Sequence, residues 1–321
     1  FEEVEYAKSK GFEVLIVDHH TKPETIPDCF VFWSDRVCAA GLSYIISQVL
    51  NHGQTDFLEL AALGTVADLQ PLLGFNRSLT KFGLEGLNST KNAGLKALKK
   101  ISGIEGKNIG TFEIGWILAP RLNASGRLEN ALESLRLLCT ENEDRALKIA
   151  EKLNSLNLER QELTKASVDL ALSITQGKSL SKINVAVHED FHDVIIGLVA
   201  GKLVSHFGTP AVVISKGEEF SKASARSVEG FNIVEFLRSL GPHFENIGGH
   251  AGAAGFTIRT ERIEEFLRTL NSYQEGLEIP LPLLKIEREL QFEDINYDLL
   301  ELLKKLAPFG IGNQEPLFLS R

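Results

Sequence analysis

The spacing of apolar residues predicts a strand followed by several helices in the first part of the chain. Residues 12–17 (FEVLIV) form a short uninterrupted apolar run between Gly11 and Asp18, which is typical of a buried parallel strand. Apolar positions at helical spacing follow this run, and Pro120 is expected to stop the last of these helices. The predicted helices cover residues 38–50, 56–67, 77–87, 94–101 and 111–119.

The longest predicted element is a helix over residues 141–176. This stretch contains neither Gly nor Pro, its apolar residues recur at helical spacing, and Gly177 follows it. A helix of about 35 residues is roughly 50 Å long, and such a helix commonly joins two domains. We therefore expect a domain boundary at this helix.

Shorter elements alternate after the long helix. Strands are predicted over residues 183–187, 211–215, 222–227 and 256–258, and helices over residues 195–206, 233–240 and 262–270. This mixture predicts a second, smaller α/β domain. From about Glu278 the chain becomes rich in proline, and a strand-like segment at 285–292 and a helix at 298–306 follow.

Composition narrows the class of protein. The chain has 321 residues, 43% of them hydrophobic and 24% charged, which excludes a disordered or membrane-spanning protein. Three widely spaced cysteines, Cys29, Cys38 and Cys139, form neither a disulfide framework nor a zinc site, so we expect buried thiols in a cytoplasmic protein. The net charge of −9 confines any nucleic-acid binding to a local basic groove.

Two polar motifs are candidates for a metal site. Asp18, His19 and His20 directly follow the first predicted strand, and the carboxyl ends of strands in open α/β sheets face the ligand crevice. Asp68 ends an otherwise apolar segment, where an unpaired charge is costly. Mixed oxygen and nitrogen ligands suit Mn²⁺ or Mg²⁺. The alternatives are a polar turn and a surface helix end.

Three further motifs have the chemistry of phosphate binding. PRLNASGRL, at residues 120–128, is expected to be a loop that carries two guanidinium groups. A serine and an arginine two residues apart share one face of a predicted strand, and a loop with four glycines follows at residues 248–256. The candidate residues are Arg121, Asn123, Arg127, Ser224, Arg226 and His250. The alternatives are a surface loop, an exposed strand face and a tight packing loop.

In this order, the five motifs resemble those of the DHH phosphoesterase superfamily and, within it, the RecJ-type single-strand-specific 5′→3′ exonucleases. Residues 308–313 (PFGIGN) resemble the start of the family's OB-fold. The resemblance implies a parallel-sheet DHH domain whose C-terminal part is residues 1–140 and a connecting helix at 141–177. It also implies a DHH-associated substrate-binding domain at 178–275, and a linker with the beginning of an OB-fold at 276–321.

The resemblance also implies the activity: metal-dependent hydrolysis of phosphodiester bonds in single-stranded DNA during recombination and repair, with two Mn²⁺ or Mg²⁺ ions in the full-length protein. A monomer and a single-stranded-DNA-binding partner protein are expected. The implied catalytic residues are Asp18, His19, His20 and Asp68, of which Asp18, His19 and Asp68 bind metal. The implied substrate-binding residues are Arg121, Asn123, Arg127, Ser224, Arg226 and His250.

Two departures from the family's pattern qualify this expectation. Earlier Asp motifs of the family are absent from the 17 residues before Asp18, so we expect a fragment that is inactive alone. Asp193 and Val194 stand where relatives carry Pro-Gly, which leaves the role of His192 open. The alternatives are a DHH-family oligoribonuclease or cyclic-dinucleotide phosphodiesterase, separable by a length series of substrates, and a catalytically inactive DHH scaffold protein.

Overall fold

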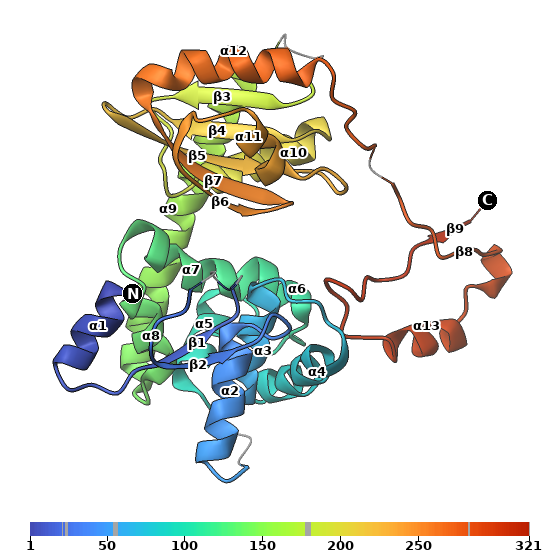
Figure 1. Cartoon of the computed structure of the whole chain (residues 1–321). Helices are drawn as coiled ribbons and strands as arrows, with labels where there is room; N and C mark the ends of the chain where they lie inside the picture. The colour runs from blue at the N-terminus through green and yellow to red at the C-terminus, as the bar shows by residue number, and fades with distance from the viewer. Residues whose placement is uncertain (21, 23–24, 54–56, 177–180, 282, 321) are drawn as a thin grey trace. The chain divides into compact units, whose positions relative to one another are not determined.

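The chain forms two compact units, seen in the computed structural model of Figure 1. The structure describes every residue except 21, 23–24, 54–56, 177–180, 282 and 321. Unit 1 comprises Phe1–Ser125, Ala131–Asn154 and Lys285–Arg321, and unit 2 comprises Gly126–Asn130 and Ser155–Leu284. The predicted long helix is confirmed as α9 (Glu143–Thr175), whose residues are shared between the units, and Gly177 lies outside the described residues.

Unit 1 contains a pair of parallel strands, β1 (Leu15–Asp18) and β2 (Phe30–Trp33), preceded by α1 (Glu2–Ser9). The parallel strand predicted near residues 12–17 is thus confirmed, and its last residue, Asp18, lies opposite Trp33. The predicted burial of residues 12–17 is wrong: Phe12 is 67% exposed and Leu15 is 54% exposed. Only two strands pair in this sheet within the described chain, so these side chains are not covered from both faces.

The helices of unit 1 pack closely where small residues meet. They are α2 (Ala39–Leu50), α3 (Leu58–Ala67), α4 (Gly74–Asn88), α5 (Ala93–Ile101) and α8 (Leu132–Cys139). A Cβ on Gly64 of α3 would overlap the Cβ of Ala40 in α2. The absence of a side chain at Gly64 therefore lets the first turn of α2 lie against the last turns of α3.

The predicted stop at Pro120 is wrong. Residues 111–128 are helical throughout, as α6 (Thr111–Glu113), a π-helical segment η1 (Ile114–Leu118) and α7 (Ala119–Leu128). Pro120 lacks an N–H and its ring would collide with the carbonyl four residues earlier in a regular α-helix. The wider π turn directly before it accommodates the ring, so residues 120–128, expected as a loop, lie mostly on a helix.

Unit 2 is built on one five-stranded mixed sheet with the order β3-β4-β5-β7-β6. The strands are β3 (Asn184–His188), β4 (Ala211–Ser215), β5 (Phe220–Arg226), β6 (Phe244–His250) and β7 (Ala253–Arg259). β3 and β4 are parallel, and the other pairs are antiparallel. The predicted mixed α/β architecture is confirmed.

Helices cover the two faces of this sheet. Apolar residues of α9 and of α10 (Ile196–Phe207) pack on one face around Ala211 and Val213. Residues of α11 (Ile233–Ser239) and α12 (Ile263–Gln274) pack on the other face around Val212 and Ile214. Successive side chains of β4 point to opposite faces of the sheet, and each face is covered by helices. Every residue of the strand can therefore be apolar.

The glycine-rich segment 248–256 is a β-hairpin, not the expected loop. β6 and β7 form its arms, with Gly248 opposite Gly255 and Gly249 opposite Ala254. Backbone ladder bonds are independent of side chains, so pairing holds this segment extended although its glycines have low strand propensity.

The C-terminal segment of unit 1 contains β8 (Arg288–Glu289), α13 (Tyr297–Lys304) and β9 (Phe318–Leu319). Leu72 N–H donates to the Ile311 carbonyl at 2.7 Å, and Thr111 Oγ1 donates to the Phe309 carbonyl at 2.7 Å. These bonds join the residues around Phe309 to the helices of unit 1. Within the described chain, no helix is both long and apolar enough to cross a membrane.

The cysteine prediction is only partly right. Cys38 is buried, whereas Cys29 is half-buried and Cys139 is exposed. Cys139 is the last residue of α8, where the helix surface faces solvent.

Candidate functional site

Four predicted residues meet in unit 1, where β1 and α3 end. Asp18 is the last residue of β1, and His19 and His20 follow it. Asp68 is the residue that caps the C-terminus of α3. His19 Nε2 lies 3.0 Å from Asp68 Oδ2, and one ligand atom from each of Asp18, His19 and His20 lies within 4.8 Å of the others. The structure thus joins two motifs that are 50 residues apart.

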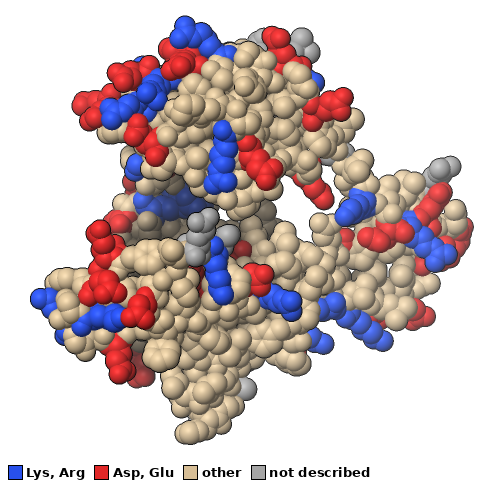
Figure 2. Space-filling view, in the orientation of Figure 1, with Lys and Arg blue, Asp and Glu red and all other residues tan. Residues whose placement is uncertain are grey.

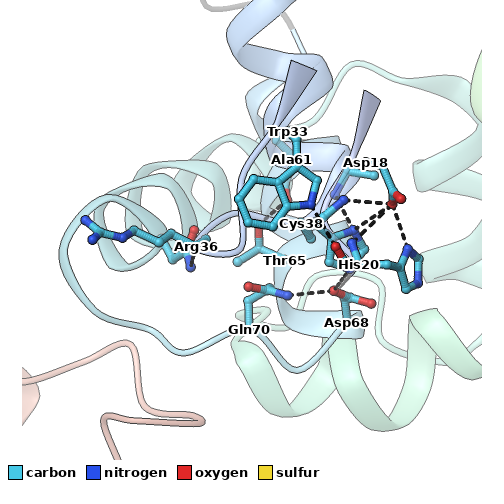
Figure 3. Close-up of polar contacts among 12 residues, drawn as sticks. Asp18, His20, Trp33, Arg36, Cys38, Ala61, Thr65, Asp68 and Gln70 are labelled. Atoms are coloured by element: carbon cyan, nitrogen blue, oxygen red, sulfur yellow. Dashed lines mark hydrogen bonds and ion pairs between the residues drawn. The ribbon is translucent and has the colours of Figure 1, made fainter. Parts of the chain in front are cut away.

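Asp18 is held by hydrogen bonds to one of its two carboxylate oxygens. Its Oδ1 accepts the backbone N–H of His19 at 2.7 Å and that of His20 at 3.3 Å, and lies 2.6 Å from His20 Nδ1 (Figure 3). The hydrogen bond from the His20 side chain, which outweighs the opposing effect of burial, lowers the pKa of Asp18 below its ordinary value. The carboxylate is therefore ionised at neutral pH.

The His19 ring is held from both sides, by the first residue of α2 at one nitrogen and by Asp68 at the other. Its Nδ1 accepts the backbone N–H of Ala39 at 3.2 Å, so in the neutral ring the proton is assigned to Nε2, which faces Asp68. The His19 side chain is 18% exposed, against 78% for His20. His19 is thus the fixed member of the pair, and His20 is the one that solvent or a ligand reaches freely.

A Schellman motif positions Asp68. Gln70 N–H donates to the Thr65 carbonyl and Leu69 N–H donates to the Val66 carbonyl, both at 3.1 Å, and Leu69 has a positive φ of 57°. This reversal places the Gln70 side chain over Asp68, where Nε2 donates to Asp68 Oδ2 at 2.8 Å (Figure 3).

The donor set fits a divalent cation that prefers oxygen with some nitrogen. The His19 ring lies between two carboxylates, with Nε2 3.0 Å from Asp68 Oδ2 and Nδ1 4.0 Å from Asp18 Oδ1. The side chains of Asp18 and Asp68 are 41% and 42% exposed, so they are accessible to a cation. In the described part of the chain, no Lys or Arg pairs with either carboxylate. Accessible carboxylates beside imidazole nitrogen are the ligand types expected of a Mn²⁺ or Mg²⁺ site.

A second group of candidates meets in unit 2, at the start of α10. Ser224 and Arg226 lie opposite Val213 and Ala211 in the β4–β5 ladder, so their side chains share the face that α10 covers. Arg226 Nη1 donates to Ser224 Oγ at 3.0 Å. A Cβ on Gly197, in the first turn of α10, would lie 2.8 Å from Arg226 Nη2 and 3.2 Å from Ser224 Oγ.

Arg127 adds a second guanidinium to this group. Its Nη1 donates to the Val194 carbonyl at 2.9 Å. Burial and, second to it, the nearby charge of Arg127 lower the pKa of Arg226. Neither arginine pairs with a carboxylate among the described residues, so two cations and the N-terminus of a helix share one place. This arrangement favours an anion such as phosphate.

The loop before α10 is tied to β5 by an ion pair. Asp193 Oδ2 lies 2.7 Å from Lys222 Nζ, while the His192 side chain is 62% exposed. The hydrogen bond from Lys222 lowers the pKa of Asp193. The two residues that replace Pro-Gly thus have structural partners, because Asp193 binds Lys222 and the Val194 carbonyl accepts from Arg127.

His250 lies in the same row of the sheet as Arg226. The register pairs Arg226 with Ala253 and Ala253 with His250, so these three residues share one face. Gly255 and Gly248 form the next row beside Ser224, and both are exposed. This exposed glycine floor allows a ligand to approach the backbone closely.

Arg121 and Asn123 form no hydrogen bond or ion pair with the residues of either cluster in the described chain. The half-buried Arg121 donates through Nε to Asn154 Oδ1 at 3.0 Å and through Nη1 to the Ile117 carbonyl at 2.7 Å, and burial lowers its pKa. It fastens α7 to α9 within unit 1. Asn123 is exposed on α7.

Several positioning groups were missed by the sequence reasoning. They are Trp33, whose Nε1 donates to the His20 carbonyl at 2.7 Å, the backbone N–H of Ala39, the Gln70 amide and Gly197. Gln70 follows Asp68 by two residues, so a search for polar neighbours of the candidate ligands finds it. The Ala39 amide has no sequence signal, because it depends on where α2 begins.

Comparison with known proteins gives matches over nearly the whole chain. The DHHA1 domain family matches residues 180–276, and the RecJ OB domain family matches residues 286–321. The single-stranded-DNA-specific exonuclease RecJ of Bacillus subtilis is 33% identical over 98% of this chain and 42% of its own length. Crystal structures of Thermus thermophilus RecJ with Mn²⁺ and with Mg²⁺ match with TM-scores of 0.90 and 0.84, both at 29% identity. They cover 99% and 96% of this chain, and 50% and 49% of the solved chains.

These matches, together with the Asp18–His20 cluster and the sheet of unit 2, place the chain in the DHH/DHHA1 superfamily. Within that superfamily the chain belongs to the RecJ family, and it spans about half the length of the curated relatives it matches. The predicted family and the predicted beginning of an OB-fold within residues 276–321 are confirmed, and the family model begins at residue 286, ahead of the segment 308–313 that carried the resemblance.

Proposed function

We propose that this chain is part of a metal-dependent 5′→3′ exonuclease that hydrolyses single-stranded DNA in recombination and repair. The observation that carries the proposal is the grouping of ligand atoms of Asp18, His19 and His20 within 4.8 Å, with Asp68 Oδ2 3.0 Å from His19 Nε2. Neither carboxylate has a Lys or Arg partner in the described chain. The RecJ relatives are named single-stranded-DNA-specific exonucleases. Hydrolysis adds water across a P–O bond, so one product carries a new phosphate oxygen and the other a hydroxyl.

The residues of unit 1 would bind metal and act on the scissile phosphate. Asp18, His19 and Asp68 would hold Mn²⁺ or Mg²⁺, which supplies charge stabilisation and an acidic bound water when present. His20, the most exposed member of the cluster, would face the phosphate. Two ions require more oxygen ligands than these carboxylates offer, so the two-ion site is proposed for the full-length protein.

The residues of unit 2 would bind the terminal phosphate of the strand. Ser224, Arg226 and Arg127 offer a hydroxyl and two guanidinium groups beside the start of α10, and His250 lies in the row of Arg226. Arg121 and Asn123 would hold the strand indirectly, by supporting α7. We further propose a cytoplasmic monomer with a single-stranded-DNA-binding partner protein, a location that suits its three free cysteines.

The test is hydrolysis of 5′-phosphorylated single-stranded DNA with Mn²⁺ by the complete product of the reading frame that encodes this chain. We expect mononucleotides from the 5′ end. Arg226→Ala should lower kcat/KM by about 10²-fold on this substrate, the cost of one lost preorganised phosphate contact, and by less on a 5′-hydroxyl strand. Arg238→Ala, on exposed Arg238 of α11, is the matched control and should have no effect.

Two results would contradict the proposal. Hydrolysis confined to short oligoribonucleotides or cyclic dinucleotides would assign the protein to that branch of the superfamily. Binding of single-stranded DNA without hydrolysis, in any divalent metal, would identify a scaffold protein.

A further inference from the structure

An aromatic groove begins beside the metal-ligand cluster in unit 1. It has a volume of about 370 Å³, and its lining includes Val66, Leu69 and Gln70 at the end of α3. Since Gln70 donates to Asp68, the groove starts one hydrogen bond from a proposed metal ligand. A polymer whose phosphate lies at Asp68 therefore has this groove as an adjacent path.

Two stacked aromatic rings form one wall of the groove. Phe112 and Trp116 have ring centroids 6.3 Å apart and planes inclined by 28°, and they are 62% and 71% exposed. Trp116 lies in the π-helical segment η1, a conformation frequently found at functional sites. Both rings are largely exposed, so the faces that they do not turn toward each other are available to a planar ligand.

The groove also contains a strained apolar residue. Leu69 has a φ of 57° and is 68% exposed. A Schellman motif favours glycine at this position, because the Cβ of any other residue is crowded in left-handed backbone. The exposed leucine side chain lines the groove, so it adds apolar surface to which a ligand can bind.

A basic hollow continues from the aromatic groove. It has a volume of about 700 Å³ and shares Thr111, Phe309 and Glu315 with the aromatic groove. Lys81 and Lys305 line it and have no ion pair in the described chain, whereas Lys304, also lining it, pairs with Glu301 at 2.7 Å. Figure 2 shows Lys and Arg side chains gathered over α4 and towards α13.

We propose that the aromatic groove and the basic hollow form a track for single-stranded nucleic acid, in which bases stack on Phe112 and Trp116 and phosphates pass Lys81 and Lys305. This inference rests on the proposed function, because it extends the strand away from the metal-ligand cluster. Aromatic faces followed by cations match the alternation of base and phosphate. Glu85 and Glu315 also line the hollow, and Lys304 is ion-paired. Lys81 and Lys305 are therefore the phosphate contacts that it offers.

The test measures binding without hydrolysis, in EDTA. The probe is fluorescein-labelled, 5′-phosphorylated dT12, and its anisotropy is followed during titration with the full chain. Trp116→Ala and Phe112→Ala should each weaken binding by about 5- to 100-fold, the range expected for one lost base stack, and Trp116→Phe should restore most of it. Lys81→Glu combined with Lys305→Glu should also weaken binding.

Matched controls separate stacking from loss of fold. Tyr273→Ala removes a 52%-exposed aromatic ring from α12, and Lys202→Glu reverses an exposed charge on α10. Both should bind dT12 like the unaltered chain. The chain has two tryptophans, so Trp33→Phe leaves Trp116 as the reporter, and dT12 should quench its fluorescence.

Unchanged dT12 affinity in Trp116→Ala would overturn the proposed track, even if Mn²⁺-dependent hydrolysis is found. Quenching of Trp116 by dT12 without hydrolysis in any metal would keep the track and reject the proposed nuclease. A concentration-dependent dimer that Trp116→Ala dissociates, with dT12 affinity unchanged, would also overturn the track and assign the rings to contact between copies of the chain.

Discussion

Single atoms decide what the Asp18–Asp68 cluster can do. Asp18 uses Oδ1 for three contacts within residues 18–20, and Asp68 uses Oδ2 for His19 and Gln70. Each carboxylate is thus oriented through one of its two oxygens. Residues 19 and 20 orient Asp18, and His19 and Gln70 orient Asp68. Orientation before ligand binding lowers the entropy lost when a metal ion is bound.

At the same scale, the Asp193–Lys222 pair predicts a pH dependence. The pKa of Asp193 is lowered in the folded chain, so its contribution to stability is complete above its unfolded pKa and is lost as the pH falls through the lower folded value. Asp193→Asn should lower the melting temperature by roughly 2 °C at pH 6–8, the size expected of an exposed pair. The difference should disappear once the pH has fallen through the lowered folded-state pKa of Asp193.

Thermal unfolding followed by circular dichroism between pH 2 and pH 8 measures this difference. A difference between variant and unaltered chain that stays constant down to pH 2 would show that the carboxylate has no such role.

Contacts at the residue scale were the least predictable part of the site. The order of the motifs indicates that Asp18 and Asp68 belong to one site, but only by resemblance to a family. The indole of Trp33 and the N–H of Ala39 act on backbone or ring atoms of His20 and His19. Their roles depend on the start of α2 and the register of β2, which hydrophobic spacing defines only within a few residues.

At the scale of elements, the site depends on how closely α2 and α3 approach. α2 supplies the N–H that orients His19, and α3 ends at Asp68. Gly64 allows this approach, because its Cβ would overlap that of Ala40. The distance between α2 and α3 therefore sets where the Ala39 N–H and the Asp68 carboxylate lie relative to the two nitrogens of the His19 ring.

Gly64→Ala should consequently destabilise unit 1 by about 1–3 kcal/mol, the cost of overpacking, although alanine favours helix formation. It should also weaken Mn²⁺ binding, because Ala39 moves relative to His19. The control is Gly201→Ala in α10, where a Cβ meets no atom within 4 Å and should leave stability unchanged or raise it by about 0.5–1 kcal/mol.

Denaturant unfolding and Mn²⁺ titration of both variants measure these effects. If Gly64→Ala were as stable as the unaltered chain and bound Mn²⁺ equally well, close packing of α2 and α3 would not position the cluster.

Elements with a strong period were predictable from the sequence, and those that depend on pairing were not. The 33-residue α9 and the strands β3 to β5 follow from spacing alone. β6 was missed because its glycines have low strand propensity, and pairing with β7 overrides that propensity. The passage of a helix through Pro120 depends on a π turn that spacing does not show.

At the scale of the whole molecule, an acidic chain has, among its described residues, cations without a carboxylate partner at two local sites. The net charge is −9, yet Arg127 and Arg226 share one place in unit 2, and Lys81 and Lys305 line one hollow in unit 1. A uniformly acidic surface would repel a polyanion, so binding must be local.

Binding of single-stranded DNA should therefore weaken steeply with salt. Two to four neutralised phosphates give a slope of about −1.5 to −3 for log K against log salt concentration, which is roughly 8- to 60-fold between 50 and 200 mM. Anisotropy of labelled dT12 in EDTA at four salt concentrations gives this slope. An affinity independent of salt would contradict the local cationic sites.

The most direct test of the account is Mn²⁺ binding to this chain, measured by electron paramagnetic resonance of the free ion. We predict that Asp68→Asn weakens Mn²⁺ binding by at least about tenfold. Asp169→Asn, which neutralises an exposed carboxylate on α9, should bind Mn²⁺ like the unaltered chain. Equal Mn²⁺ affinity of the Asp68→Asn variant and the unaltered chain would contradict the claim that the residues around His19 form a metal site.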